Sequence, residues 1–226
     1  RDDNDRFVVF EVQSDRHPPS YHSMDLASFT IHEIADAFPW IDPERMRSTM
    51  LFEYATLDGH SFDAYLTLPA KSSRGDKPPM LVLARGGPAE RETWGWDPEV
   101  QFLASRGYAV LRVNHRGSSG SSRRLSEADP GGFRQIHEDV TAGVTAAVKT
   151  GNVDPTRIGI MGTGFGGWLA LAGAAYEPGK YRCIVTISGI FDWAQRLRDV
   201  RHNTYVQVEK SVLQRRLGDP EKNIAR

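Results

Sequence analysis

The chain has 226 residues, of which 39% are hydrophobic and 25% charged, and its formal net charge is −1 at pH 7. This composition is typical of a globular protein with one large or two small domains, and the balanced charge gives no support for binding to nucleic acid or to an anionic membrane. No apolar run approaches the roughly 18 residues of a membrane span. The first ten residues do not form a signal peptide, one cysteine excludes an intrachain disulfide, and we expect a cytoplasmic protein without metal or cofactor.

Short apolar strands separated by turns characterise the beginning of the chain. We predict strands at Phe7–Val12, Tyr21–Asp25 and Ser28–Glu33. Strands at this spacing suggest an all-β module, but these residues are too few for an independent core. Phe38 to Pro43 is predicted to be a linker.

A β-hairpin is predicted next, with strands at Met50–Leu57 and Ser61–Leu68 around Asp58-Gly59, which is a strong turn signal. From Met80 onward, apolar strands alternate with helices. This alternation predicts a doubly wound, mostly parallel α/β sheet with helices on both faces. The predicted elements are strand Met80–Ala84, helix Asp97–Arg106, strand Tyr108–Val113, helix Gly132–Thr150, strand Ile158–Met161, helix Trp168–Tyr176, strand Arg182–Ile187 and helix Thr204–Leu217.

Four glycines lie within Gly162–Gly167, between a predicted strand and a predicted helix. The spacing matches the nucleophile elbow, G-x-S-x-G, with Gly164 in place of the serine at the tip. It also matches the dinucleotide fingerprint G-x-G-x-x-G. That fingerprint requires the first βα unit and an acid at the end of the next strand, where this chain has Ser188-Gly189. A turn that only packs a helix on a sheet is the third alternative, and we favour the elbow.

A second glycine-rich loop, Arg85-Gly86-Gly87-Pro88, directly follows the strand Met80–Ala84. A backbone N–H of this loop, together with that of Phe165 after the tip, would form an oxyanion hole. The alternative is an ordinary Gly-Gly-Pro turn. Because the elbow follows at the right later position, we favour the oxyanion hole.

Other polar residues are expected to have structural roles. His115 follows a strand, but it precedes the elbow, whereas the base of an elbow serine normally comes after it. We expect Arg116 to bond loop carbonyls, and Asp139 to be solvated or to pack against a helix. Cys183 lies in an apolar strand pattern and is expected in the core.

Several sequence blocks, in a fixed order, resemble the prolyl oligopeptidase family of serine peptidases, which includes acylaminoacyl-peptidases and dipeptidyl aminopeptidases. The resemblance implies an α/β-hydrolase domain at residues 48–226, preceded at residues 1–47 by the end of a β-propeller and a linker. In this family the propeller limits access to the active site, so short peptides or acyl-peptides are the implied substrates. The blocks are Arg85–Pro88, Leu103–Val110, Asn114–Gly120, Val153–Gly162 and Ser188–Trp193.

Departures from the family pattern bear on activity. The family nucleophile would be at position 164, where this chain has Gly164, and the histidine before Gly86 is replaced by Arg85. The family's Asp and His would lie beyond Arg226. The resemblance still assigns Gly87 and Phe165 to the oxyanion hole. The chain as written is therefore expected to be an inactive serine peptidase, or alternatively a non-catalytic binder of peptides or proteins.

The last predicted strand, Arg182–Ile187, has no further predicted strand to pair with in this chain. Open apolar edges of this kind invite pairing with other chains. We therefore expect a longer parent chain, or a homo-oligomer that covers the edge.

Overall fold

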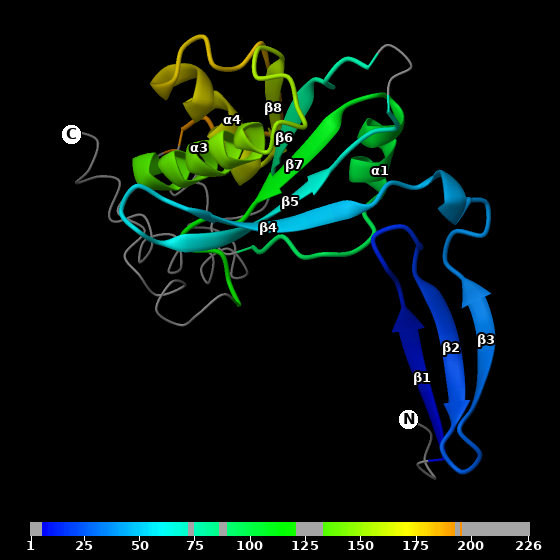
Figure 1. The fold of residues 1–226 in the computed structure, drawn as a ribbon. Helices are drawn as coiled ribbons and strands as arrows, with labels where there is room; N and C mark the ends of the chain where they lie inside the picture. Colours follow the sequence, from blue (N-terminus) through cyan, green and yellow to red (C-terminus); the bar gives the residue numbers. More distant parts are fainter. Residues whose placement is uncertain (1–5, 72–74, 86–89, 121–132, 193–194, 196–226) are drawn as a thin grey trace.

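The computed structural model describes residues 6–71, 75–85, 90–120, 133–192 and 195. They form a three-stranded sheet and a six-stranded sheet with three longer helices (Figure 1). The strands are β1 (Phe7–Val12), β2 (Ser20–Asp25), β3 (Thr30–Asp36), β4 (Thr49–Ala55), β5 (Ser61–Thr67), β6 (Met80–Ala84), β7 (Ala109–Val113), β8 (Ile158–Thr163) and β9 (Cys183–Ile187). The helices are the short 3₁₀ helix η1 (Pro43–Arg45) and the α-helices α1 (Pro98–Ser105), α3 (Phe133–Lys149) and α4 (Phe165–Tyr176).

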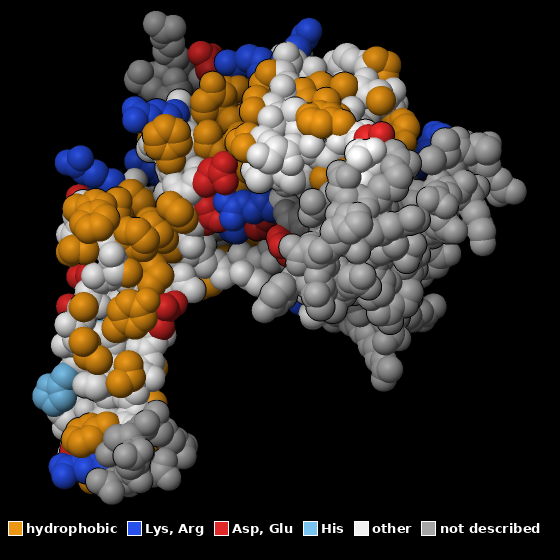
Figure 2. Space-filling view, turned by 180° about the vertical axis from the view of Figure 1, so that it is seen from behind, with side chains coloured by type: hydrophobic (Ala, Val, Ile, Leu, Met, Phe, Trp, Pro, Cys, Tyr) orange, Lys and Arg blue, Asp and Glu red, His pale blue; other side chains and the backbone are white. Residues whose placement is uncertain are grey.

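The N-terminal sheet is antiparallel, in the order β1-β2-β3, and projects from the body of the molecule as an arm (Figure 1). Hydrophobic side chains gather along this arm (Figure 2). Val9, Ile31 and Ile34 are more than half exposed. A sheet with so much uncovered apolar surface does not bury its faces alone, so the arm has the character of one part of a larger β structure.

The second sheet is mixed and has the order β4-β5-β7-β6-β8-β9. The hairpin β4–β5 pairs antiparallel with β7, whereas β6 is parallel to both β7 and β8, and β8 is parallel to β9. All residues of the central strands β6 and β7 are buried, as expected where helices cover both faces of a parallel sheet. The predicted doubly wound α/β sheet is thereby confirmed.

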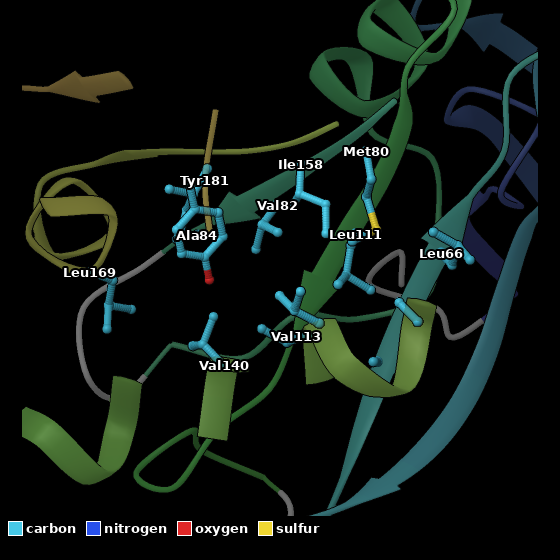
Figure 3. Packing of buried hydrophobic residues seen from close by; sticks show 14 of the residues in the cluster. Leu66, Met80, Val82, Ala84, Leu111, Val113, Val140, Ile158, Leu169 and Tyr181 are labelled. Carbon is cyan, nitrogen blue, oxygen red and sulfur yellow. The ribbon is translucent and has the colours of Figure 1, made fainter. Parts of the chain in front are cut away.

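Alternate residues of β6 contribute to two separate cores. Met80, Val82 and Ala84 belong to the larger core, which includes residues of α3 and α4 (Figure 3). Leu83 points to the opposite face, where it packs with Val100 of α1. Helix α1 therefore covers one face of the sheet, and α3 and α4 cover the other.

Gln101 of α1 joins the arm to the six-stranded sheet. Its Nε2 donates to the carbonyl oxygens of Asp15 at 2.9 Å and Arg47 at 2.8 Å, and its Oε1 accepts from the Arg47 amide at 2.8 Å. The Asp15 carboxylate in turn accepts from the Thr49 amide at 2.7 Å. One buried amide side chain thus ties together the residues on either side of the linker.

Two sequence predictions need correction here, and one lies outside the described residues. The helix expected from Trp168 begins at Phe165. Gly166 and Gly167 were assigned to a turn, but they are helical, and their lack of a side chain allows close packing against neighbouring residues. Cys183 is exposed rather than in the core, because β9 is the last strand of the sheet among the described residues and has alternate residues uncovered. The predicted helix Thr204–Leu217 is in the part of the chain that is not described.

Candidate active site

The order of the strands creates a crevice in the six-stranded sheet, at the carboxyl ends of its parallel strands. From β6 the chain crosses to β7 on one side and then returns to β8 on the other side of β6. Ligands of open α/β sheets bind at such a switch point, beyond the carboxyl ends of the strands. Ala84 and Gly162 are paired at these ends, so the residues that follow β6 and β8 lie next to each other.

Gly164 is the single residue between β8 and α4. Its φ of 57° and ψ of −115° lie in a region that side-chain-bearing residues rarely adopt. Three backbone hydrogen bonds of Gly164 hold the bend: its N–H donates to Ile187 O at 2.9 Å, and its carbonyl accepts from the amides of Trp168 at 3.2 Å and Ile190 at 3.4 Å. A Cβ placed on Gly164 would meet no atom of the described residues within 4 Å. As far as the described part of the chain goes, position 164 therefore faces open space.

Glycines on both sides of Gly164 allow the helix to approach the sheet. A Cβ on Gly166 would lie 1.9 Å from the Ala84 carbonyl oxygen, and one on Gly162 would lie 2.3 Å from the Gly166 carbonyl carbon. Neither position can hold a side chain without moving main chain. These contacts press the beginning of α4 against the end of β6, where the Arg85 loop begins, which is the packing that a nucleophile elbow requires.

Phe165, the first residue of α4, is buried beside the tip. Its ring lies 6.2 Å from the His115 ring and 5.5 Å from the Trp168 ring, measured between centroids. The Nδ1 atom of His115 and the Arg116 carbonyl oxygen are 2.7 Å apart. The structure thus brings together Gly164, Phe165 and His115, whereas Gly87 lies outside the described residues.

Arg85, which stands before the Gly86-Gly87 pair, is turned toward the N-terminus of α1. Its Nη1 lies 2.5 Å from Asp97 Oδ2, and its Nη2 lies 2.9 Å from Glu99 Oε2. Burial opposes the charged form, but the hydrogen bond to Asp97 and the charges of Asp97, Glu92 and Glu99 outweigh it and raise the pKa of Arg85. Asp97 also accepts from the amides of Glu99 and Val100, so this N-cap anchors both the helix and the arginine.

The predicted partners of Arg116 were wrong, and so was the solvated alternative for Asp139. Among the described residues the Arg116 side chain bonds carboxylates rather than loop carbonyls: its Nε and Nη2 each lie 2.7 Å from an oxygen of the Asp139 carboxylate, and Nη2 also lies 2.9 Å from Asp58. Asp139 is fully buried. Hydrogen bonding to Asp139 raises the pKa of Arg116 above its ordinary value. Sequence alone missed this pair because Asp139 belongs to α3, 23 residues along the chain.

A polar pocket lies beside this edge of the sheet and was not predicted from the sequence. Its volume is about 230 Å³, and its walls come from the loop Glu90–Asp97, the ends of β6 and β7, and Gln13 of the arm. Acidic and basic side chains lie next to each other where the arm meets the body (Figure 2). Among the described residues, no group of three or more His, Cys, Asp or Glu side chains could hold a metal ion.

Comparison with known proteins identifies the family. A model of the prolyl oligopeptidase family matches residues 94–210, which is more than half of the chain. The chain belongs to the prolyl oligopeptidase family. The family assignment agrees with the resemblance seen in the sequence. It is supported by dipeptidyl aminopeptidase BIII of Pseudoxanthomonas mexicana, which is 30% identical over 224 residues, or 96% of this chain and 32% of that protein.

Further relatives agree with this assignment. The acylamino-acid-releasing enzyme of Sus scrofa is 30% identical over 146 residues, covering 64% of this chain and 20% of the enzyme. The crystal structure of a puromycin hydrolase has a TM-score of 0.82 and 25% identity, and the match covers 98% of this chain and 34% of that structure. The chain thus spans between a fifth and a third of the length of these relatives.

The family fold explains the two sheets. The six-stranded sheet with its helices is part of an α/β-hydrolase domain, and the arm supplies strands from the end of the preceding β-propeller. The uncovered apolar faces of the arm agree with this, because a propeller blade packs between neighbouring blades. In the described part of the chain, no helix is long and apolar enough to cross a membrane.

Proposed function

We propose that this chain is part of a serine-type hydrolase that acts on short peptides or acyl-peptides through an acyl-enzyme, with Gly164 at the position of the nucleophile. The Phe165 and Gly87 amides are the proposed donors of the oxyanion hole. Without a hydroxyl at position 164, the chain as written is proposed to be inactive. The proposed domain boundary lies between residues 47 and 48, next to the contacts of Gln101 with Arg47.

The conformation of Gly164 is the observation that carries this proposal. The tip combines a positive φ, a helix that begins at the next residue, and a place for a side chain that no atom of the described residues occupies. A packing turn has no need of all three, whereas an elbow needs each one to expose a nucleophile above the sheet. The dinucleotide alternative has less support, since β8 follows β6 and β7 and thus is not in the first βα unit.

The chemistry follows from the position of the tip. A serine hydroxyl at position 164 would attack the acyl carbon of a bound substrate, and the oxygen of that acyl group would take up negative charge. The Phe165 amide lies at the N-terminus of α4, where backbone N–H groups stabilise such a charge. No residue of this chain is assigned as the general base or its acidic partner.

Restoring the hydroxyl tests the proposal. Gly164→Ser in the longest available parent chain is expected to gain hydrolysis of short peptide amides and acyl esters, because removal of a triad serine costs about 10⁶-fold in turnover. Gly164→Ala is the matched control, since it introduces the same backbone strain without a nucleophile. A correctly folded Gly164→Ser protein that stays as inert as Gly164→Ala would contradict the proposal.

A non-catalytic peptide- or protein-binding role is the second candidate. The glycines that shape the elbow are retained although the tip has no side chain, which suits a cleft that binds without reacting. Calorimetric titration with short peptides separates the two roles: binding by the Gly164 chain, with no activity in the Gly164→Ser protein, supports this second role. Absence of binding at millimolar peptide counts against it.

We also propose a cytoplasmic location and no nucleic-acid partner. The exposed free thiol of Cys183 suits a reducing compartment, and the net charge of −1 offers no attraction to phosphate backbones.

A further inference from the structure

The polar pocket beside the elbow contains a buried arginine whose hydrogen bonds are incomplete. Arg112 of β7 lines the pocket, and about 4% of its surface is exposed. Its Nη1 lies 3.0 Å from Glu92 Oε2, and its guanidinium carbon lies 5.3 Å from the centre of the Tyr65 ring. Its Nε and Nη2 are buried and have no hydrogen-bond acceptor within the described residues. Buried N–H groups of a charged side chain are costly to leave in this state.

Arg116 shows what these two nitrogens are suited to bind. In that residue the same pair, Nε and Nη2, holds both oxygens of the Asp139 carboxylate at 2.7 Å. The pair forms a planar fork whose spacing matches a carboxylate, which is why bidentate arginine–carboxylate pairs are strong and specific. Arg112 presents the same fork, and Glu92 occupies only its other nitrogen, Nη1.

A further donor lies in the wall of the same pocket. The indole Nε1 of Trp96 is buried and also has no acceptor within the described residues. The Trp96 ring is held by Phe38 of the linker, with 4.8 Å between ring centroids. Three donor nitrogen atoms on two residues of this pocket therefore have no acceptor within the described residues, while the carboxylates of Glu92 and Asp97 are bound to arginine or to backbone amides.

We propose that this pocket is a subsite for a carboxylate group, bound by Nε and Nη2 of Arg112 and by Nε1 of Trp96. The substrate class that follows is a short peptide with a free C-terminal carboxylate, and this part of the inference rests on the proposed function. The volume of about 230 Å³ suits a carboxylate with one or two adjoining residues rather than a long chain.

The position of the pocket agrees with a role in substrate binding. His115 lines the pocket and also lies beside Phe165, so the pocket adjoins the residue that follows the tip. Burial raises the pKa of Glu92, although Arg112 and Arg85 oppose this and Asp97 adds to it. This shift is in the direction that lessens the repulsion between Glu92 and a second carboxylate at Arg112.

Calorimetric titration of the chain with triglycine and with triglycine amide tests the subsite without any catalytic step. The free acid is expected to bind at least about tenfold more tightly than the amide. In Arg112→Lys, which keeps the charge but loses the fork, this preference is expected to disappear. Arg134→Gln, which changes an exposed arginine on α3, is the control and is expected to keep it. Sodium acetate as a competitor separates recognition of the carboxylate alone from recognition of a whole peptide terminus.

The outcomes are distinct. Displacement of triglycine by acetate supports a subsite for any small carboxylate, and a preference for triglycine that acetate does not affect supports a peptide-terminus subsite. Equal binding of acid and amide overturns the inference, as does a preference that survives in Arg112→Lys. If Arg112→Lys does not fold, Trp96→Phe, which removes only the Nε1 donor, is expected to weaken the preference, and an unchanged preference overturns the inference. The hydrolysis assay of Gly164→Ser is independent of these results, so either idea can fail alone.

Discussion

Arg116 and Asp139 form a bidentate ion pair in which both Arg116 Nε and Arg116 Nη2 lie 2.7 Å from an Asp139 carboxylate oxygen. The Arg116 amide donates to the same carboxylate at 2.9 Å. The pair connects the loop after β7 with α3, and it fixes the loop that places His115 against Phe165.

Asp139→Asn is expected to lower the free energy of unfolding by about 3–5 kcal/mol, because it removes the buried carboxylate that pairs with Arg116 and leaves only the partly exposed Asp58 as a partner. Urea denaturation followed by circular dichroism measures the change. Glu138→Gln is the matched control: its pair with Arg134 is on the surface, so a change under about 0.5 kcal/mol is expected. Equal effects of the two substitutions would contradict a structural role for the buried pair.

Alanine substitutions at two glycines of the elbow are expected to lower the free energy of unfolding by different amounts. Gly164→Ala is expected to cost about 1–3 kcal/mol, since its Cβ meets no described atom within 4 Å and the cost comes from the positive φ. Gly166→Ala costs more than about 4 kcal/mol, because its Cβ would overlap the Ala84 carbonyl. Thermal and urea unfolding of the two proteins check this order, and a Gly166→Ala protein as stable as Gly164→Ala would show that α4 does not press on β6.

Acid is expected to destabilise the protein through His137. Burial lowers the pKa of this α3 residue, and its Nδ1 has no partner within the described residues. The unfolded chain therefore takes up a proton at a higher pH than the folded one. The stability that neutral His137 allows is present above its unfolded pKa of about 6.5 and is lost as the pH falls below it.

His137→Phe removes this titration. The free energy of unfolding of the variant is expected to depend less on pH between about 5 and 7 than that of the parent. His32→Phe, at an exposed position on β3, is the control and should keep the pH dependence of the parent. A parent protein equally stable at both ends of this range would contradict the prediction.

We propose that the edge of β9 causes self-association of the isolated chain. Within the described residues β9 pairs only with β8, and Val185 and Ile187 are 44% and 46% exposed. Sedimentation velocity is expected to show concentration-dependent oligomers, and Val185→Lys is expected to shift them toward monomer, because charged residues protect sheet edges. Leu57→Lys, at the fully exposed tip of the β4–β5 hairpin, is the control and should leave the distribution of oligomers unchanged. A monomeric parent at high concentration would contradict the proposal.

Gln101→Ala is expected to loosen the attachment of the arm to the six-stranded sheet. The substitution leaves the backbone groups of Asp15 and Arg47 without their partner, at a cost of about 1–3 kcal/mol for each buried group that remains unpaired. Limited proteolysis should then cleave more rapidly between residues 37 and 47. Phe102→Ala, an exposed change on the same helix, serves as the control. Equal cleavage rates in the parent chain and in Gln101→Ala would show that Gln101 does not hold the arm against the six-stranded sheet.

Local pattern was sufficient to predict most of the fold. The bounds of β1 and β6 were predicted residue for residue, because each is a mainly apolar segment flanked by polar residues or proline. The turn at Asp58-Gly59 was also predicted, and Gly59 has the positive φ of 83° that such a turn requires. Glycine spacing likewise indicated the elbow before its conformation was known.

Contacts between distant elements could not be predicted in the same way. The partner of Arg116 lies on α3, and the pocket that contains Arg112 depends on the loop Glu90–Asp97 folding across β7. Cys183 has the same apolar neighbours in sequence as a core residue, but its strand is at the edge of the sheet. Strand order decides these cases, and a single sequence does not contain it in any local pattern.

The spacing of the elbow glycines also has a genetic consequence. Gly162 and Gly166 are confined by main-chain atoms, while a side chain at position 164 would meet none of the described residues. Some glycine and serine codons differ by one nucleotide, so a single base change can add or remove a hydroxyl at this point with every neighbouring contact intact. A mutation at position 164 can therefore change the reactivity of the domain without changing its fold.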